Sequence, residues 1–112
     1  MQPEARSLLH DIAEAIELIF VFTEAMDWSA YSRDAKTRAA VEREFITIGE
    51  AVRRLTMFAP GVAEQIPDAR MMINFRNVIT HNYDKIEDAV VWGIINRNLR
   101  SLNEIAMQFL QD

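Results

Sequence analysis

The sequence contains no cysteine, so disulfide bonds and thiolate metal sites are excluded. Its 112 residues include only three glycines and three prolines, which argues against long loops and β-barrels. No apolar run approaches the roughly 20 residues of a membrane-spanning helix, and residues 1–6 lack the layout of a signal peptide. These absences favour a cytoplasmic protein that makes no contact with a membrane.

The net charge of −5 by itself argues against a nucleic-acid partner. The acidic excess is confined to residues 1–27, which contain six acidic residues and one basic residue, whereas residues 28–112 contain eleven of each. A basic patch outside the first segment is therefore compatible with the composition. The length and the 50% hydrophobic content fit a single domain, residues 1–112, with a core of its own.

Apolar residues recur every three or four positions in four segments, which is the pattern of amphipathic helices. The segments are about 5–26, a second that is capped by Ser32 or Asp34 and ends near 58, then 69–80 and 87–112. Residues 27–32 are expected to form a connector, and residues 62–66 one extra helical turn. The sequence thus predicts an all-α, antiparallel four-helix bundle with a short extra turn before the third main helix.

Three positions within these helices carry more specific expectations. Gly49 lies inside the second helix, where glycine costs about 1 kcal/mol relative to alanine, so close approach of another backbone is the expected compensation. Asp68 is expected to cap the third helix with its side chain. Glu42, Arg53 and other charged residues off the apolar seam of the second helix are expected to be solvated, although some could contact a polyanion.

The stretch from Arg76 to Tyr83 concentrates the chemically useful side chains. The guanidinium of Arg76 matches the geometry of phosphate oxygens, and His81 is the residue type best suited to move protons near neutral pH. Together they favour phosphoryl chemistry on an anionic substrate. The structural alternative is that Arg76 pairs with an acid, His81 caps helix carbonyls and Tyr83 is a buried aromatic.

On a regular helix Arg76 and His81 point about 140° apart, while Arg76 shares a face with Thr80 and Asn77 shares one with His81. Three arrangements could still direct Arg76 and His81 to one point. The helix could end or distort at residues 80–81, the arginine could bend over, or a two-fold dimer could place two copies around one cleft. A dimer would also supply two imidazoles, one as base and one as acid.

The Arg-x4-His-x-Tyr pattern resembles the signature of the HEPN superfamily, and the wider sequence resembles its HepT-like (DUF86) branch. Three segments carry the likeness in order along the chain: residues 48–51 (Ile-Gly-Glu-Ala), residues 75–83 (Phe-Arg-Asn, then His-x-Tyr) and residues 91–92 (Val-Trp). The likeness spans almost the whole chain. It implies a HEPN-like four-helix bundle.

The resemblance also implies a function. HepT-like proteins are metal-independent ribonuclease toxins of toxin–antitoxin pairs, need no cofactor, and form homodimers with the motif in the cleft between subunits. Their usual antitoxin is a small nucleotidyltransferase (MNT), which in some members attaches AMP to the motif tyrosine. Carried over, Arg76 would bind the scissile phosphate and His81 would act as general acid and base. Asn77 and Thr80 would support them, and Tyr83 would be the AMPylation candidate.

Two other functions are compatible with the sequence. The acidic net charge and the single useful histidine suit a non-catalytic module that binds a nucleotidyltransferase or RNA. The apolar residues Val21 and Phe22, which widen the stripe of the first helix, suit a structural helical dimer. A carboxylate-bridged metal enzyme is not expected, because neither histidine follows a glutamate at the Glu-x-x-His spacing.

Overall fold

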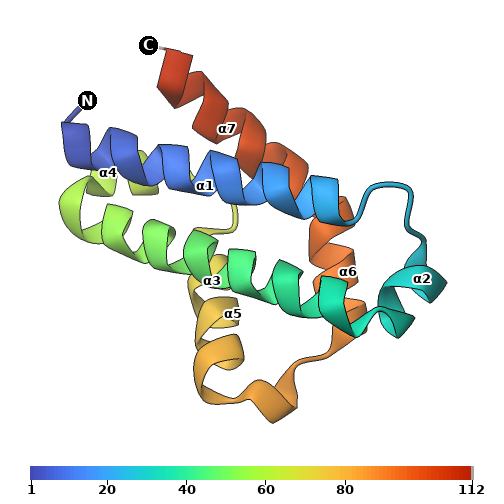
Figure 1. Ribbon diagram of the computed structural model, residues 1–112. Coiled ribbons are helices and arrows are strands. Elements are labelled where there is room, and N and C mark those ends of the chain that lie inside the picture. The colour runs from blue at the N-terminus through green and yellow to red at the C-terminus, as the bar shows by residue number, and fades with distance from the viewer. Residues whose placement is uncertain (112) are drawn as a thin grey trace.

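The computed structural model describes residues 1–111, and over that range the chain is helical with no strand, which confirms the all-α bundle (Figure 1). The helices are α1 (Pro3–Phe22), α2 (Trp28–Arg33), α3 (Ala35–Phe58), α4 (Pro60–Ala63), α5 (Ala69–His81), the 3₁₀ turn η1 (Tyr83–Lys85), α6 (Asp88–Arg97) and α7 (Leu99–Gln111). A short extra turn before the third main helix is present as α4, but it spans Pro60–Ala63 and not the predicted residues 62–66, because Pro60 is pre-set for the first position of a helix. No helix within residues 1–111 combines the length and apolar character needed to cross a bilayer.

Two long helices, α1 and α3, pack against each other in opposite directions and form the centre of the molecule (Figure 1). The α7 helix packs on α1, whereas α5 packs on α3 and extends from its other side in this view. The core consists of the predicted apolar stripes; its largest fully buried side chains include Leu9, Ile12, Ile16, Ile19, Phe45, Ile48 and Leu55. Because α3 lies between α1 and α5, one face of α3 packs against α1 and another face packs against α5.

The connector predicted at residues 27–32 contains a helix instead. Asp27 accepts a hydrogen bond from the Ala30 N–H at 2.8 Å and so caps α2. Asp34 does the same for α3 through the Thr37 N–H at 3.0 Å, as one of the two predicted caps. The α2 turn buries Tyr31 completely.

The predicted last helix is divided at Asn98 into α6 and α7. The Asn98 amide donates a hydrogen bond at 2.9 Å to the carboxylate of Asp68. The prediction that the Asp68 side chain caps α5 is therefore wrong. Asp68 has φ 60°, in the left-handed region, rather than the extended backbone that a side-chain cap requires, and its carboxylate binds the α6–α7 joint instead.

Candidate functional site

The contact between α3 and α5 is closest at Gly49. A Cβ atom built there would lie 2.3 Å from the Cβ of Arg76 and 2.7 Å from the carbonyl oxygen of Met72. The close approach expected from a glycine inside a helix is thus confirmed. Beside it, the rings of Phe45 and Phe75 meet edge to face at 5.1 Å. These contacts place the base of the Arg76 side chain directly against α3.

The Arg76 guanidinium is held from two sides. Its Nη2 lies 3.4 Å from Oε2 of Glu50 on α3, and its Nη1 donates to Oδ1 of Asn77 at 3.1 Å. Its Nε is buried and has no hydrogen-bond partner among residues 1–111. Glu50 also accepts two hydrogen bonds from Arg53, at 2.7 and 3.3 Å. Those bonds hold the pKa of Glu50 below its ordinary value, so the carboxylate is charged at neutral pH.

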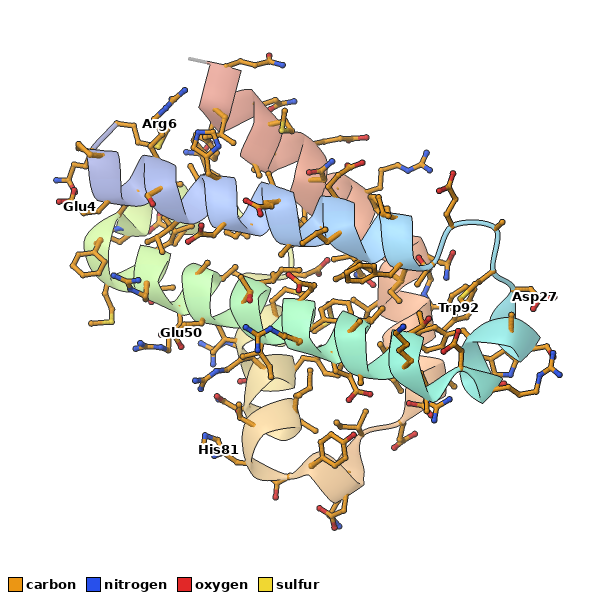
Figure 2. All side chains as sticks on the ribbon, in the orientation of Figure 1. Glu4, Arg6, Asp27, Glu50, His81 and Trp92 are labelled. Atoms are coloured by element: carbon orange, nitrogen blue, oxygen red, sulfur yellow. The ribbon has the colours of Figure 1, made fainter. Side chains whose placement is uncertain are left out.

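The predicted site residues at the end of α5 are exposed. His81 is the last residue of the helix, which ends directly after it. In Figure 2, Glu50 and His81 lie on the same side of the molecule. The Thr80 hydroxyl donates to the carbonyl oxygen of Arg76 at 2.7 Å, one turn earlier. The structure therefore brings Arg76, Asn77 and Thr80 together, whereas His81 has no hydrogen bond to Arg76 within residues 1–111.

Tyr83 begins the 3₁₀ turn that follows α5 and has 66% of its surface exposed. The alternative that it is a buried aromatic residue is therefore wrong. The chain leaves the helix at Asn82, whose backbone is no longer helical, and this carries Tyr83 away from the core. Its ring is exposed two residues after His81, while its hydroxyl is hydrogen-bonded to Glu42.

Glu42 is 6% exposed, so the prediction that it is solvated is wrong. Burial raises the pKa of this carboxyl, nearby Asp88 raises it further, and a hydrogen bond with Tyr83 and the charge of Arg38 oppose the rise. Arg38 and Asp88 form an ion pair at 3.4 Å. The sequence contains only a weak indication of this burial. Glu42 directly follows Val41 and so borders the apolar face of α3.

Tyr31 lies close to this carboxyl. Burial raises the pKa of its phenol, and the charges of Glu42 and Asp88 add to the rise, so the phenol is protonated. Its hydroxyl has no hydrogen-bond partner among residues 1–111. Its ring stacks on Trp92 of α6, with centroids 5.1 Å apart. Tyr31 of α2 and Glu42 of α3 therefore form a buried polar cluster, which Trp92 of α6 covers on one side.

Replacing Glu42 with glutamine is expected to stabilise the protein increasingly as the pH rises above about 4.5, the ordinary pKa of this carboxyl. Because the folded-state pKa is raised, the folded protein binds more protons than the unfolded chain in this range, and wild-type stability falls as Glu42 ionises. Glutamine cannot ionise. Thermal midpoints of both proteins between pH 4 and pH 8 measure the difference. Glu104→Gln, on the exposed surface of α7, is the control; a constant difference for Glu42→Gln across this range contradicts the prediction.

An apolar groove lies on the other flank of α5, between α5 and α6. Its lining includes Phe75, Val78, Val90, Ile94 and Arg97. On a helix with 100° per residue, Phe75 and Val78 point well away from Arg76 and Thr80. The groove is therefore separate from the motif, which lies on an exposed face of the single chain.

Sequence comparisons identify the family to which the chain belongs. The family model described as "Ribonuclease HepT-like" matches residues 12–109. The chain belongs to the HepT-like family of the HEPN superfamily. It is 33% identical over 102 residues to "Probable ribonuclease HepT" of Thermococcus cleftensis, covering 91% of this chain and 92% of the relative. It is also 33% identical over 103 residues to "Putative RNase MJ0127" of Methanocaldococcus jannaschii, covering 91% of this chain and 84% of the relative. No solved structure matches the chain significantly.

Proposed function

We propose that the protein is a metal-independent endoribonuclease that cleaves RNA at the face formed by the end of α5. The observation that carries the proposal is an arginine fixed at its base, with a partly unsatisfied guanidinium, five residues before an exposed histidine at the end of the same helix. Family membership supports the same chemistry. The fixed guanidinium is suited to a phosphate because little of its freedom remains to be lost on binding.

The reaction follows from these side chains. Arg76 binds the non-bridging oxygens of the scissile phosphate and stabilises the charge that develops on them. A histidine removes the proton of the neighbouring 2′-hydroxyl, whose oxygen attacks phosphorus. The bond to the 5′-oxygen breaks, and that oxygen takes a proton from an acid. The products are a 2′,3′-cyclic phosphate and a 5′-hydroxyl. Asn77 orients Arg76, and Thr80 supports the last turn of the helix.

A homodimer completes this mechanism. One imidazole cannot act as base and acid in the same step, and each chain offers a single histidine at this face. Two chains related by a two-fold axis would place two copies of Arg76 and His81 around one phosphodiester. The exposure of His81 on the single chain supports this, because an exposed face needs a second surface to exclude water.

We further propose that the protein is the toxin of a toxin–antitoxin pair whose antitoxin is a nucleotidyltransferase. The 66% exposure of Tyr83 supports this, since its ring is open to another enzyme, which needs only to displace Glu42 from the hydroxyl. Attachment of AMP there would add a negative phosphate close to His81 and compete with RNA. Intact-mass measurement after co-expression with a nucleotidyltransferase encoded next to this gene tests the assignment. An added AMP that disappears in Tyr83→Phe supports it, and an unmodified wild-type mass contradicts it.

Purified protein is expected to cleave single-stranded RNA in the presence of excess EDTA and to leave 2′,3′-cyclic phosphate ends. Labelled RNA resolved on a denaturing gel detects the cleavage. The cyclic ends resist phosphatase until they are opened by acid. Intact RNA with protein freed of any antitoxin and of AMP contradicts the proposal. If RNA binding without cleavage is unchanged by His81→Ala, the chain is instead a non-catalytic binding module.

A further inference from the structure

Glu50 contacts two arginines at once. Its Oε1 accepts from Nη2 of Arg53 at 2.7 Å, while its Oε2 lies 3.3 Å from Nε of Arg53 and 3.4 Å from Nη2 of Arg76. Figure 2 shows Glu50 on the side of α3 from which α5 extends. Two guanidinium groups therefore meet at one carboxylate. The local charge is positive by one, in a protein whose net charge is −5.

The two arginines differ in how freely they can move. The Arg76 side chain is 24% exposed, begins against Gly49 and has a buried Nε, so its position is fixed by packing. The Arg53 side chain is 44% exposed, and its Nη1 also contacts the sulfur of Met57 at 3.3 Å, which is a weak acceptor. An exposed ion pair three residues apart on a helix contributes little to stability. Arg53 can therefore exchange Glu50 for a stronger acceptor at little cost.

We propose that Arg53 is a second phosphate-binding residue, which leaves Glu50 and contacts an RNA phosphate adjacent to the one bound by Arg76. This inference rests on the proposed function. A phosphate offers Arg53 the same paired oxygens that Glu50 offers. Two neighbouring phosphates of an RNA strand are best bound by two cations that lie side by side. Arg53 and Arg76 lie side by side in the free protein because both contact Glu50.

Arg54 supplies a matched control on the same helix. It is adjacent in sequence and carries the same charge, but its guanidinium lies 5.6 Å from the ring centroid of Phe58. It lines a hollow with Pro3 and Asp11 of α1, on the flank of α3 that faces away from α5. Removing Arg54 therefore changes the total charge as much as removing Arg53 but removes no direct contact of Glu50, on which Arg54 acts through its charge alone.

The test measures binding of a fluorescein-labelled 2′-O-methyl oligonucleotide, which cannot be cleaved, by fluorescence anisotropy. Arg53→Ala is expected to weaken binding about 10-fold, as for the loss of one charge-assisted hydrogen-bonding partner. The slope of log K against log salt should fall by about 0.7, as for one phosphate contact fewer on a single strand. Arg54→Ala is expected to change affinity less than 2-fold, roughly the effect of distant charge alone. Equal effects of the two substitutions overturn the proposal.

A second pair of variants separates phosphate binding from the ion pair. If Arg53 serves only as the partner of Glu50, Arg53→Ala has no further effect once Glu50→Gln has removed the carboxylate. A phosphate contact instead predicts the same loss of about 10-fold in the Glu50→Gln background. Because this oligonucleotide is not a substrate, the result is independent of catalysis. A wild type that cleaves RNA while both Arg53 variants bind normally overturns only this inference, and an Arg53 effect in a protein without nuclease activity overturns only the proposed reaction.

Discussion

Replacing His81 with alanine is expected to slow RNA cleavage by about 10²- to 10⁴-fold, the range for loss of a general acid or base. The imidazole is exposed at the end of α5, so its removal leaves no cavity and no buried group without a partner. The free energy of unfolding should stay within about 0.5 kcal/mol of the wild type. Single-turnover cleavage of labelled RNA and a urea denaturation curve measure the two effects.

The other histidine is the control for this substitution. His10 is exposed on α1, so His10→Ala makes the same chemical change far from the motif and should leave cleavage unchanged. A His81→Ala variant that cleaves at the wild-type rate would falsify the catalytic assignment.

Mixed dimers test whether both imidazoles act on one bond. If they do, an equal, randomised mixture of wild-type and His81→Ala chains should retain about a quarter of the wild-type activity. About half would remain if each chain worked alone.

Replacing Gly49 with alanine is expected to destabilise the fold by about 1–3 kcal/mol, although alanine is the better helix former. The new Cβ would lie 2.3 Å from the Cβ of Arg76 and 2.7 Å from a backbone carbonyl oxygen, and neither is the end of a flexible side chain. The α5 helix must therefore move away from α3. Arg76 would leave the reach of Glu50, and cleavage should fall together with stability. Urea denaturation and the cleavage assay measure both.

The other two glycines are controls, because an added Cβ meets less steric hindrance at each of them than at Gly49. At Gly61, nothing lies within 4 Å of an added Cβ, so Gly61→Ala should be neutral or slightly stabilising. At Gly93, the nearest atom is Nη2 of Arg97 at 2.3 Å, the end of a long side chain that can swing aside. Equal stability of the alanine variants at 49 and 61 would show that α3 and α5 do not depend on close contact.

The helices and the closest contact between them could be predicted because both depend on local, repeated patterns. The apolar stripe of α3 predicted its buried face, and a glycine in the middle of it indicated where another backbone approaches. The motif residues were recognisable as a set because they lie within eight positions of the chain. These residues lie near one another in space because they occupy the last turns of one helix and the turn that follows it.

The polar interior could not be predicted in the same way. Burial of Glu42 depends on α2, a six-residue helix that periodicity could not distinguish from a connector. The pairing of Arg76 with Glu50 requires residues 26 positions apart to meet, which depends on how α3 and α5 pack. The hydrogen bond between Asn98, where the last helix is divided, and Asp68 likewise joins residues 30 positions apart. The spacing of apolar residues along the chain does not predict which polar side chains of different helices will meet.

The placement of α1 across α3 from α5 also affects how a polyanion would first meet the molecule (Figure 1). Residues 1–27 carry the entire acidic excess, so the protein has a charge dipole whose negative pole lies at α1. An incoming nucleic-acid strand is repelled by that pole and turned toward the opposite one before any contact forms. Counterions screen both this orienting effect and the repulsion from the net charge of −5, so both weaken as the ionic strength rises.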